Sequence, residues 1–258
     1  MGKAIAIYNQ KGGVGKTTTN INLAACLAKK GKRILVIDID PQCNTTVGLG
    51  IARKHMEYSL YDVLIDEDLD PNDAIVFHGL PNLWIIPASV KLAAAEIEFV
   101  ELEGREHRLK KALEKVKDNY DYIFIDCPPS LGLLTINSLT AVDSVLIPIQ
   151  CEFYALDGVS QLLSTIELVK RKMNPDLEVQ GVILSMFDGR TNLSIQVVEE
   201  VKKYFKDKVY STVIPRNVKL AEAPGFGLPI TEYDDHSKGA EAYREFAEEF
   251  LKDEEARA

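Results

Sequence analysis

The sequence predicts an α/β fold in which a doubly wound, mostly parallel sheet carries helices on both of its faces. Short apolar runs rich in β-branched residues alternate with longer segments of helical period, as expected for strands joined by crossover helices. Most of these runs are apolar throughout, which is typical of strands covered on both faces. A glycine-rich turn also separates the first run from the first helical segment, and open α/β sheets bind phosphate groups at such turns.

Seven strands are expected from the apolar runs. They cover residues 4–8, 33–39, 83–87, 122–126, 144–149, 179–185 and 209–214. Between these runs, apolar side chains recur with helical period. The expected helices include residues 21–30, 105–117, 159–173 and 194–205. Residues 48–82 are the least regular part and are expected to hold short helices and loops. Because the chain shows no repeat and no linker-like change of composition, residues 1–258 are predicted to form a single domain.

Composition argues against several classes of protein. The chain has 258 residues, of which 46% are hydrophobic, and this is enough for one large core. No apolar stretch approaches the roughly 20 residues that a spanning helix needs, so a cytoplasmic protein without a membrane partner is expected. The four cysteines form no Cys-x-x-Cys pair and lie at no ligand spacing from a histidine. Neither a zinc site nor a disulfide framework is therefore expected.

The glycine-rich turn has the composition of a phosphate-binding loop. It reads Lys11-Gly12-Gly13-Val14-Gly15-Lys16-Thr17-Thr18. Such a turn exposes successive backbone N–H groups and directs the positive end of the helix dipole at one point. Lys16 is expected to reach the outer phosphates, the Thr17 hydroxyl to coordinate Mg²⁺, and Thr18 to add a phosphate contact. An ordinary glycine-rich turn bearing a lysine is the alternative, but strand, turn and helix all agree with the phosphate loop.

Acidic residues end two of the predicted strands, where ligands of open α/β sheets bind. Asp126 ends the run 122–126 and is expected to hold Mg²⁺ directly or through a water molecule, as the aspartate beside a P-loop does. Asp38 lies at the end of the second run, and Asp40 directly follows it. For either residue taken alone, capping of the next helix is the alternative role.

The loop departs from the common P-loop pattern at one position. Where that pattern has a glycine five positions before Gly15, this chain has Gln10 followed by Lys11. The form Lys-Gly-Gly-x-Gly-Lys-Thr resembles the deviant Walker A motif of the ParA/MinD family of ATPases. The resemblance implies ATP and Mg²⁺ as cofactors, and a homodimer in which Lys11 reaches the nucleotide of the partner subunit. There it would act as an arginine finger does, whereas a solvated loop lysine is the alternative. The resemblance also implies that Asp40 positions the attacking water and that Asp38 supports the lysine and metal network.

Two further segments resemble the chromosomal ParA-type ATPases, and the similarity covers nearly the whole chain. They are residues 213–224 and 188–192. The resemblance implies that Pro215 and Asn217 contact the adenine end of the nucleotide, and that Arg190 and Lys219 bind DNA without sequence preference. Residues 186–220 carry seven basic against four acidic residues, in a chain of net charge −9. Solvated helical faces are the alternative explanation of this basic stretch.

These features predict a chromosome- or plasmid-partitioning ATPase. Its ATP-bound dimer would bind double-stranded DNA on the nucleoid, and slow hydrolysis stimulated by a ParB-type partner would release it. Hydrolysis is expected to be slow because no strong general base is evident beside Asp40. A MinD-like positioning ATPase is disfavoured, because residues 245–255 are mostly acidic and anionic lipid would repel them. A small-molecule ATP-dependent enzyme remains the alternative, because many functions share one fold.

Overall fold

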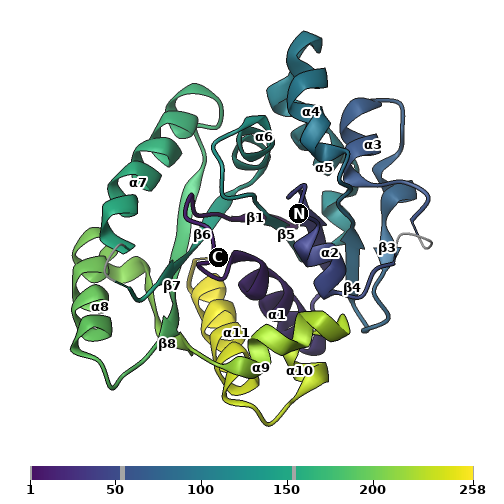
Figure 1. Ribbon diagram of the computed structural model, residues 1–258. Coiled ribbons are helices and arrows are strands. Elements are labelled where there is room, and N and C mark those ends of the chain that lie inside the picture. Colours follow the sequence, from purple (N-terminus) through teal and green to yellow (C-terminus); the bar gives the residue numbers. More distant parts are fainter. Residues whose placement is uncertain (1, 53–55, 153–154, 258) are drawn as a thin grey trace.

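An eight-stranded sheet forms the centre of the computed structural model, which describes residues 2–52, 56–152 and 155–257. The strands are β1 (Lys3–Ile7), β2 (Ile34–Asp38), β3 (Val76–Phe77), β4 (Leu83–Ile86), β5 (Tyr122–Asp126), β6 (Ser144–Gln150), β7 (Glu178–Phe187) and β8 (Val209–Pro215). Their order across the sheet is β3-β4-β2-β5-β1-β6-β7-β8 (Figure 1). All neighbours pair in parallel except β3 and β4.

The seven expected strands are confirmed, each within two residues of its expected ends. The additional strand, β3, was not expected. It has only two residues, which is too short to carry the alternating pattern that identifies a strand. Its antiparallel pairing with β4 makes the sheet mostly, and not wholly, parallel.

Eleven α-helices are present among the described residues. They are α1 (Lys16–Lys29), α2 (Asn44–Gly48), α3 (Leu60–Ile65), α4 (Leu92–Glu98), α5 (Arg108–Val116), α6 (Leu133–Ala141), α7 (Ala155–Lys172), α8 (Asn192–Phe205), α9 (Val218–Glu222), α10 (Ile230–Tyr233) and α11 (Lys238–Arg257). Helices α1, α5, α7 and α8 confirm the four expected helices. Within the described part of the chain, no helix is both long and apolar enough to cross a membrane.

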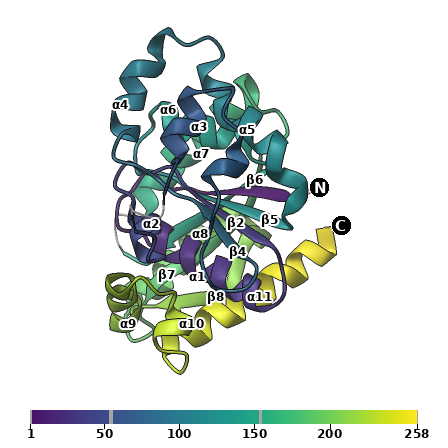
Figure 2. The ribbon, with the colours of Figure 1, turned by 90° about the vertical axis from the view of Figure 1, so that its right-hand side faces the viewer.

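Helices pack against both faces of the sheet, so the doubly wound arrangement is confirmed (Figures 1 and 2). Alternate side chains of β1 enter two separate cores, with Ala4 and Ala6 in one and Ile5 and Ile7 in the other. Helices α3, α5, α6, α7 and α8 line the first core, and α1 and α11 line the second. Strand β1 lies between β5 and β6, where the strand order changes direction and ligands of such sheets bind.

Helix α11 closes the second core with aromatic side chains. Phe250 is fully buried, and its ring centroid lies 5.3 Å from that of Tyr122 and 6.0 Å from that of Phe124. These rings bury a large apolar area between the helix and strand β5, which makes α11 part of the same core as the strand that ends at Asp126.

Replacing Phe250 with alanine is expected to lower the free energy of unfolding by about 3–5 kcal/mol, because the helix and sheet cannot close the cavity that remains. Urea denaturation followed by circular dichroism measures this change. Ile97→Ala provides the control, because that side chain is 77% exposed and its loss should cost about 0.5 kcal/mol or less. Equal losses in the two variants would contradict the assignment of Phe250 to the core.

Candidate nucleotide-binding site

The P-loop connects β1 to α1 at the carboxyl edge of the sheet, while both termini lie near the opposite edge (Figure 2). Gly13 and Gly15 have φ angles of +75° and +89°, values that side chains with a Cβ rarely adopt. Gly15 is also the N-cap residue of α1. The turn therefore places the positive end of this 14-residue helix directly after the glycines, as a phosphate site requires.

Two neighbouring strands hold the P-loop in place. The side-chain amide of Asn9 donates to the carbonyl oxygen of Pro148 in β6 at 2.8 Å. The hydroxyl of Ser185 in β7 donates to the carbonyl oxygen of Val14 at 2.7 Å. Both bonds are buried, so the loop is fixed by the two strands that follow β1 on one side of the sheet. These anchors were not predicted from the sequence.

Gln10 has a structural role that the sequence did not reveal. Its side-chain amide donates to the hydroxyl of Thr165 in α7 at 2.8 Å. Its backbone does not take a positive φ angle, so no glycine is needed at this position. The residue that departs from the common P-loop pattern thus ties the loop to helix α7.

The two lysines of the loop differ in their surroundings. Lys16 is only 7% exposed, and its ammonium group donates to the carbonyl oxygen of Lys11 at 3.2 Å. Burial lowers the pKa of the Lys16 ammonium, and the nearby carboxylates of Asp126 and Asp40 oppose this shift. The Lys11 side chain is half-buried and forms no ion pair with any residue of the described ranges.

Asp126 has the surroundings of a cation ligand. One of its oxygens, Oδ2, accepts hydrogen bonds from the hydroxyls of Thr17 at 2.7 Å and Thr45 at 2.8 Å. The other oxygen, Oδ1, is buried and has no hydrogen-bond partner. Burial raises the pKa of this carboxyl, and the two threonine hydroxyls oppose the shift. A buried carboxylate oxygen without a partner, beside a threonine hydroxyl, fits the oxygen ligands that Mg²⁺ prefers.

Asp38 and Asp40 lie in different surroundings at the end of β2. Asp38 is fully buried and accepts hydrogen bonds from the backbone N–H and the hydroxyl of Thr46 at 2.8 and 2.7 Å. It thus accepts a hydrogen bond from a free backbone N–H in the first turn of α2. This contact resembles the helix capping that was the alternative role for Asp38. Burial raises the pKa of Asp38, as does the neighbouring carboxylate of Asp126. These hydrogen bonds go to α2 and not to Lys16, so the expected support of the lysine by Asp38 is not direct.

Asp40 begins the turn that leads from β2 into α2. Its Oδ1 atom accepts a hydrogen bond from the backbone N–H of Gln42 at 2.9 Å, and the side chain is nearly buried. Its carboxylate acts on the pKa of Lys16, which places the two side chains in one site. Asp40 therefore lies near Lys16 without capping α2, whose N-cap residue is Cys43.

The residues expected near the adenine end of the nucleotide follow β8. Pro215 ends this strand opposite Phe187. Asn217 is the N-cap residue of α9, and its side-chain oxygen accepts a hydrogen bond from the backbone N–H of Lys219 at 2.8 Å. Because parallel strands end at the same edge of the sheet, this segment lies at the P-loop edge.

Arg190 and Lys219, the expected DNA-binding residues, are exposed and paired with nearby acids. The side chain of Arg190 is 90% exposed and forms an ion pair with Asp188 at 2.7 Å. Lys219 forms an ion pair with Glu222 at 2.9 Å and lies 5.6 Å from the centre of the Tyr233 ring. Exposed pairs of this kind contribute little to stability and can exchange partners.

The fold divides the basic stretch of the sequence between two places. Arg190, Arg216 and Lys219 follow the ends of β7 and β8, at the same edge as the P-loop. Helix α8 then crosses the sheet, so the remaining basic residues lie near its C-terminal end, at the opposite edge. These are Lys202, Lys203, Lys206 and Lys208. Neighbours in the sequence are thus separated in space.

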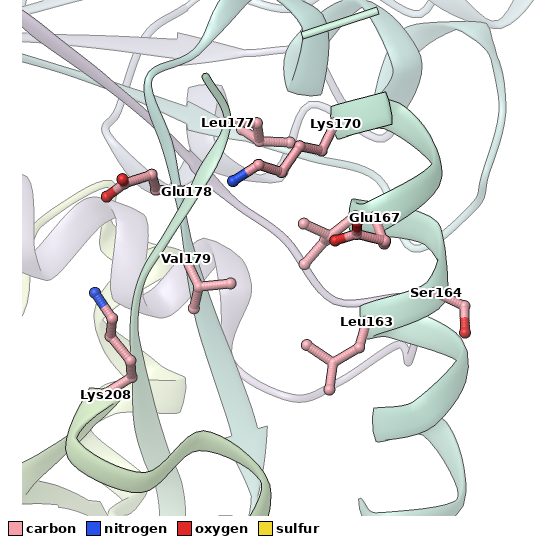
Figure 3. A pocket seen from close by; sticks show the side chains of 9 residues that line it. Leu163, Ser164, Glu167, Lys170, Leu177, Glu178, Val179 and Lys208 are labelled. Atoms are coloured by element: carbon pink, nitrogen blue, oxygen red, sulfur yellow. The ribbon is translucent and has the colours of Figure 1, made fainter. Parts of the chain in front are cut away.

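Two of the cavities that the described residues form could accommodate a small molecule. One, of about 580 Å³, lies between α7 and the amino ends of β7 and β8. Figure 3 shows its charged side chains, Glu167, Lys170, Glu178 and Lys208. Since β7 runs parallel to β1, this is the edge away from the P-loop. The other cavity, of about 430 Å³, lies beside α2 and is lined in part by Thr46.

Comparisons with known proteins agree with this geometry. The family model AAA_31, described as an AAA domain, matches residues 2–179. The sporulation initiation inhibitor protein Soj of Bacillus subtilis is 64% identical over 249 residues, which are 96% of this chain and 98% of that protein. The chromosome partitioning protein ParA of Myxococcus xanthus is 52% identical over 98% of this chain and 89% of its own length.

Solved structures are also similar to this chain over nearly its whole length. Cobyrinic acid a,c-diamide synthase from Mycobacterium smegmatis, with a bound ATP analogue and magnesium, has a TM-score of 0.88 and 38% identity, over 100% of this chain and 97% of that chain. The septum site-determining protein MinD from Pyrococcus horikoshii, complexed with Mg-ADP, has a TM-score of 0.82 and 27% identity, over 100% and 99% of the two chains.

Proposed function

Because this chain belongs to the ParA/MinD family of P-loop ATPases, we propose that it is a chromosome-partitioning ATPase that binds ATP with Mg²⁺. The observation that carries the proposal is the buried site in which the P-loop, Asp40 and Asp126 meet at one edge of the sheet. Nearly the whole chain is similar to proteins named Soj and ParA, and this extent favours partitioning over other functions of the family.

The residues of the site have distinct proposed roles. The backbone N–H groups of residues 12–18 and the ammonium of Lys16 bind the phosphates, with Thr18 as an additional contact. Thr17 and Asp126 would hold Mg²⁺, which when bound neutralises charge on the phosphate oxygens. Pro215 and Asn217 would contact the adenine end.

Hydrolysis is proposed to depend on one residue from each subunit of a dimer. Asp40 orients the attacking water in a nearly buried position beside Lys16. Lys11, which has no acidic partner within the described part of its own subunit, reaches the nucleotide of the partner and stabilises charge on the transferred phosphoryl group. We propose that hydrolysis is slow, because Asp40 has no stronger base beside it, and that a ParB-type protein accelerates it.

DNA binding is proposed for the exposed basic residues that follow β7 and β8. These residues lie at the same edge of the sheet as the P-loop. The bound nucleotide could therefore control whether this surface binds DNA. Two copies in a dimer would double the number of phosphate contacts and therefore steepen the dependence on salt. The lysines at the far end of α8 are not part of this surface.

The double variant Arg190→Ala with Lys219→Ala is expected to lose most ATP-dependent binding to double-stranded DNA. Each side chain that contacts a phosphate should also contribute about one unit to the slope of log affinity against log salt. Fluorescence anisotropy with labelled DNA, in ATP, in ADP and without nucleotide, measures both quantities across a salt series.

The variant Lys202→Ala with Lys203→Ala is the matched control, because it removes the same charge from the opposite edge. It should bind DNA as the unmodified protein does. Equal losses in the two double variants would show that net charge, and not this surface, determines binding. Binding that ignores the nucleotide would contradict the proposed switch.

A small-molecule ATP-dependent enzyme is the second candidate. It is favoured by the 430 Å³ cavity beside α2 and by the similarity to a protein described as a cobyrinic acid a,c-diamide synthase. In that case DNA would not bind in any nucleotide state, and a small-molecule substrate would accelerate ATP hydrolysis. The same salt series therefore distinguishes the two functions.

A further inference from the structure

Asp126 receives two hydroxyl groups on a single oxygen, and only one of them comes from the P-loop. Thr17 donates to Oδ2 at 2.7 Å, and Thr45, from α2, donates to the same atom at 2.8 Å. Oδ1 is left buried and without a partner. Both hydroxyls thus donate to Oδ2, and Oδ1 stays free to bind a cation.

The hydroxyl of Thr45 has only one orientation that satisfies its neighbours. Its oxygen accepts a hydrogen bond from the side-chain amide of Asn20 in α1 at 3.3 Å, so its single proton is directed to Asp126. All three side chains are buried, with at most 1% exposed. Because water does not reach this chain of bonds, each bond restrains the rotation of the next group.

The position of Thr45 along the chain gives this contact a second consequence. Residues 40–44 join Asp40 to the start of α2, so Thr45 lies one residue beyond the turn that carries the proposed water-positioning group. The adjacent Thr46 holds Asp38. Helix α2 is thereby hydrogen-bonded to the ends of both β2 and β5. A displacement of Asp126 would therefore also displace α2 and the turn that contains Asp40.

We propose that Thr45 is a positioning residue for the divalent cation of the nucleotide site. It holds the Asp126 carboxylate so that Oδ1 is presented to the cation, although it does not contact the cation itself. Groups that orient a metal ligand commonly change metal affinity by about 10- to 100-fold when they are removed. The inference depends on the proposed Mg²⁺ nucleotide site, but not on DNA binding.

The test compares Thr45→Val, which removes the hydroxyl, with Thr45→Ser, which keeps it. Mn²⁺ binding to the complex with ADP is measured by electron paramagnetic resonance, which needs no hydrolysis. We expect Thr45→Val to bind Mn²⁺ about 10-fold more weakly or worse, while Thr45→Ser stays within about 3-fold of the unmodified protein. ADP binding in the presence of EDTA should be the same in all three.

Thr19→Val is the control for the loss of a buried hydroxyl, because Thr19 lies in the same helix as Thr17 but pairs with Tyr243. It should leave Mn²⁺ affinity unchanged. If Thr45→Val does not give a folded protein by circular dichroism, Thr45→Ala removes the same hydroxyl without placing a methyl group against Asp126, and the same loss is expected.

Three results would overturn the inference. They are unchanged Mn²⁺ affinity in Thr45→Val, an equal loss in Thr45→Ser, and an equal loss in Thr19→Val. Failure of the unmodified protein to bind Mn²⁺ with ADP would instead refute the proposed nucleotide site. The two failures are therefore distinguishable.

Discussion

Asp40→Ala is expected to bind ATP, dimerise and hold DNA while its rate of ATP hydrolysis falls by about 100-fold or more. The groups proposed to bind the nucleotide and its cation belong to the P-loop, Asp126, Pro215 and Asn217, so binding should not require Asp40. Its carboxylate lies beside Lys16, where it acts on the pKa of that ammonium. Phosphate release and binding of a fluorescent ATP analogue measure the two effects separately.

Asp40→Asn separates the charge of this residue from its place in the turn. The amide oxygen of asparagine can still accept the hydrogen bond from the backbone N–H of Gln42, so the segment before α2 should keep its conformation. Hydrolysis should fall as far as in the alanine variant, with the same thermal midpoint as the unmodified protein. An asparagine variant that turns over ATP normally would remove Asp40 from the proposed role.

Gly12→Val is expected to abolish the ATP-dependent dimer and leave a folded monomer that binds ATP. A Cβ atom added at Gly12 would meet no atom within 4 Å, and the backbone there has no positive φ angle. The single subunit therefore accepts the valine without strain. Its two methyl groups would instead occupy the exposed surface that a second subunit must approach, which light scattering with ATP detects.

Gly13→Ala is the comparison variant, because it introduces backbone strain within the subunit. Gly13 also has open space around it, but its φ angle of +75° disfavours any side chain. This variant should weaken nucleotide binding by the monomer, whereas Gly12→Val should not. A normal ATP-dependent dimer in Gly12→Val would exclude a close approach of two subunits at this loop.

The fold could be predicted from the sequence because its strands are short, apolar and regularly spaced. Most of the seven expected strands are buried on both faces, so hydrophobicity alone marks their positions, whereas β8 lies at the edge of the sheet and is only partly buried. Strand β3 escaped prediction because two residues at the edge of a sheet carry no periodic pattern. Residues 48–82, which were expected to hold short helices and loops, contain α3 and this strand.

The candidate site was predictable where its residues are close in sequence. The glycines, Lys16 and Thr17 lie within one turn and the helix that follows, so local sequence identifies them as candidates. Asp126 could be assigned because an acid that ends a buried strand must lie at the same edge as the P-loop. The roles of these residues, like those of Lys11, Asp40, Pro215 and Asn217, stay predictions, since they depend on a nucleotide, a cation or a second subunit.

By itself, the sequence determined the type of fold, the phosphate loop and the strand ends at which the site forms, because these depend on local pattern. Only the tertiary structure decided which side chains complete the site. Thr45 and Asp126 are 81 residues apart, and Ser185 and Val14 are 171 apart. Such contacts arise from the order of strands in the sheet, which no local pattern encodes. For the same reason the basic stretch, continuous in the sequence, is divided between two edges by the passage of α8 across the sheet.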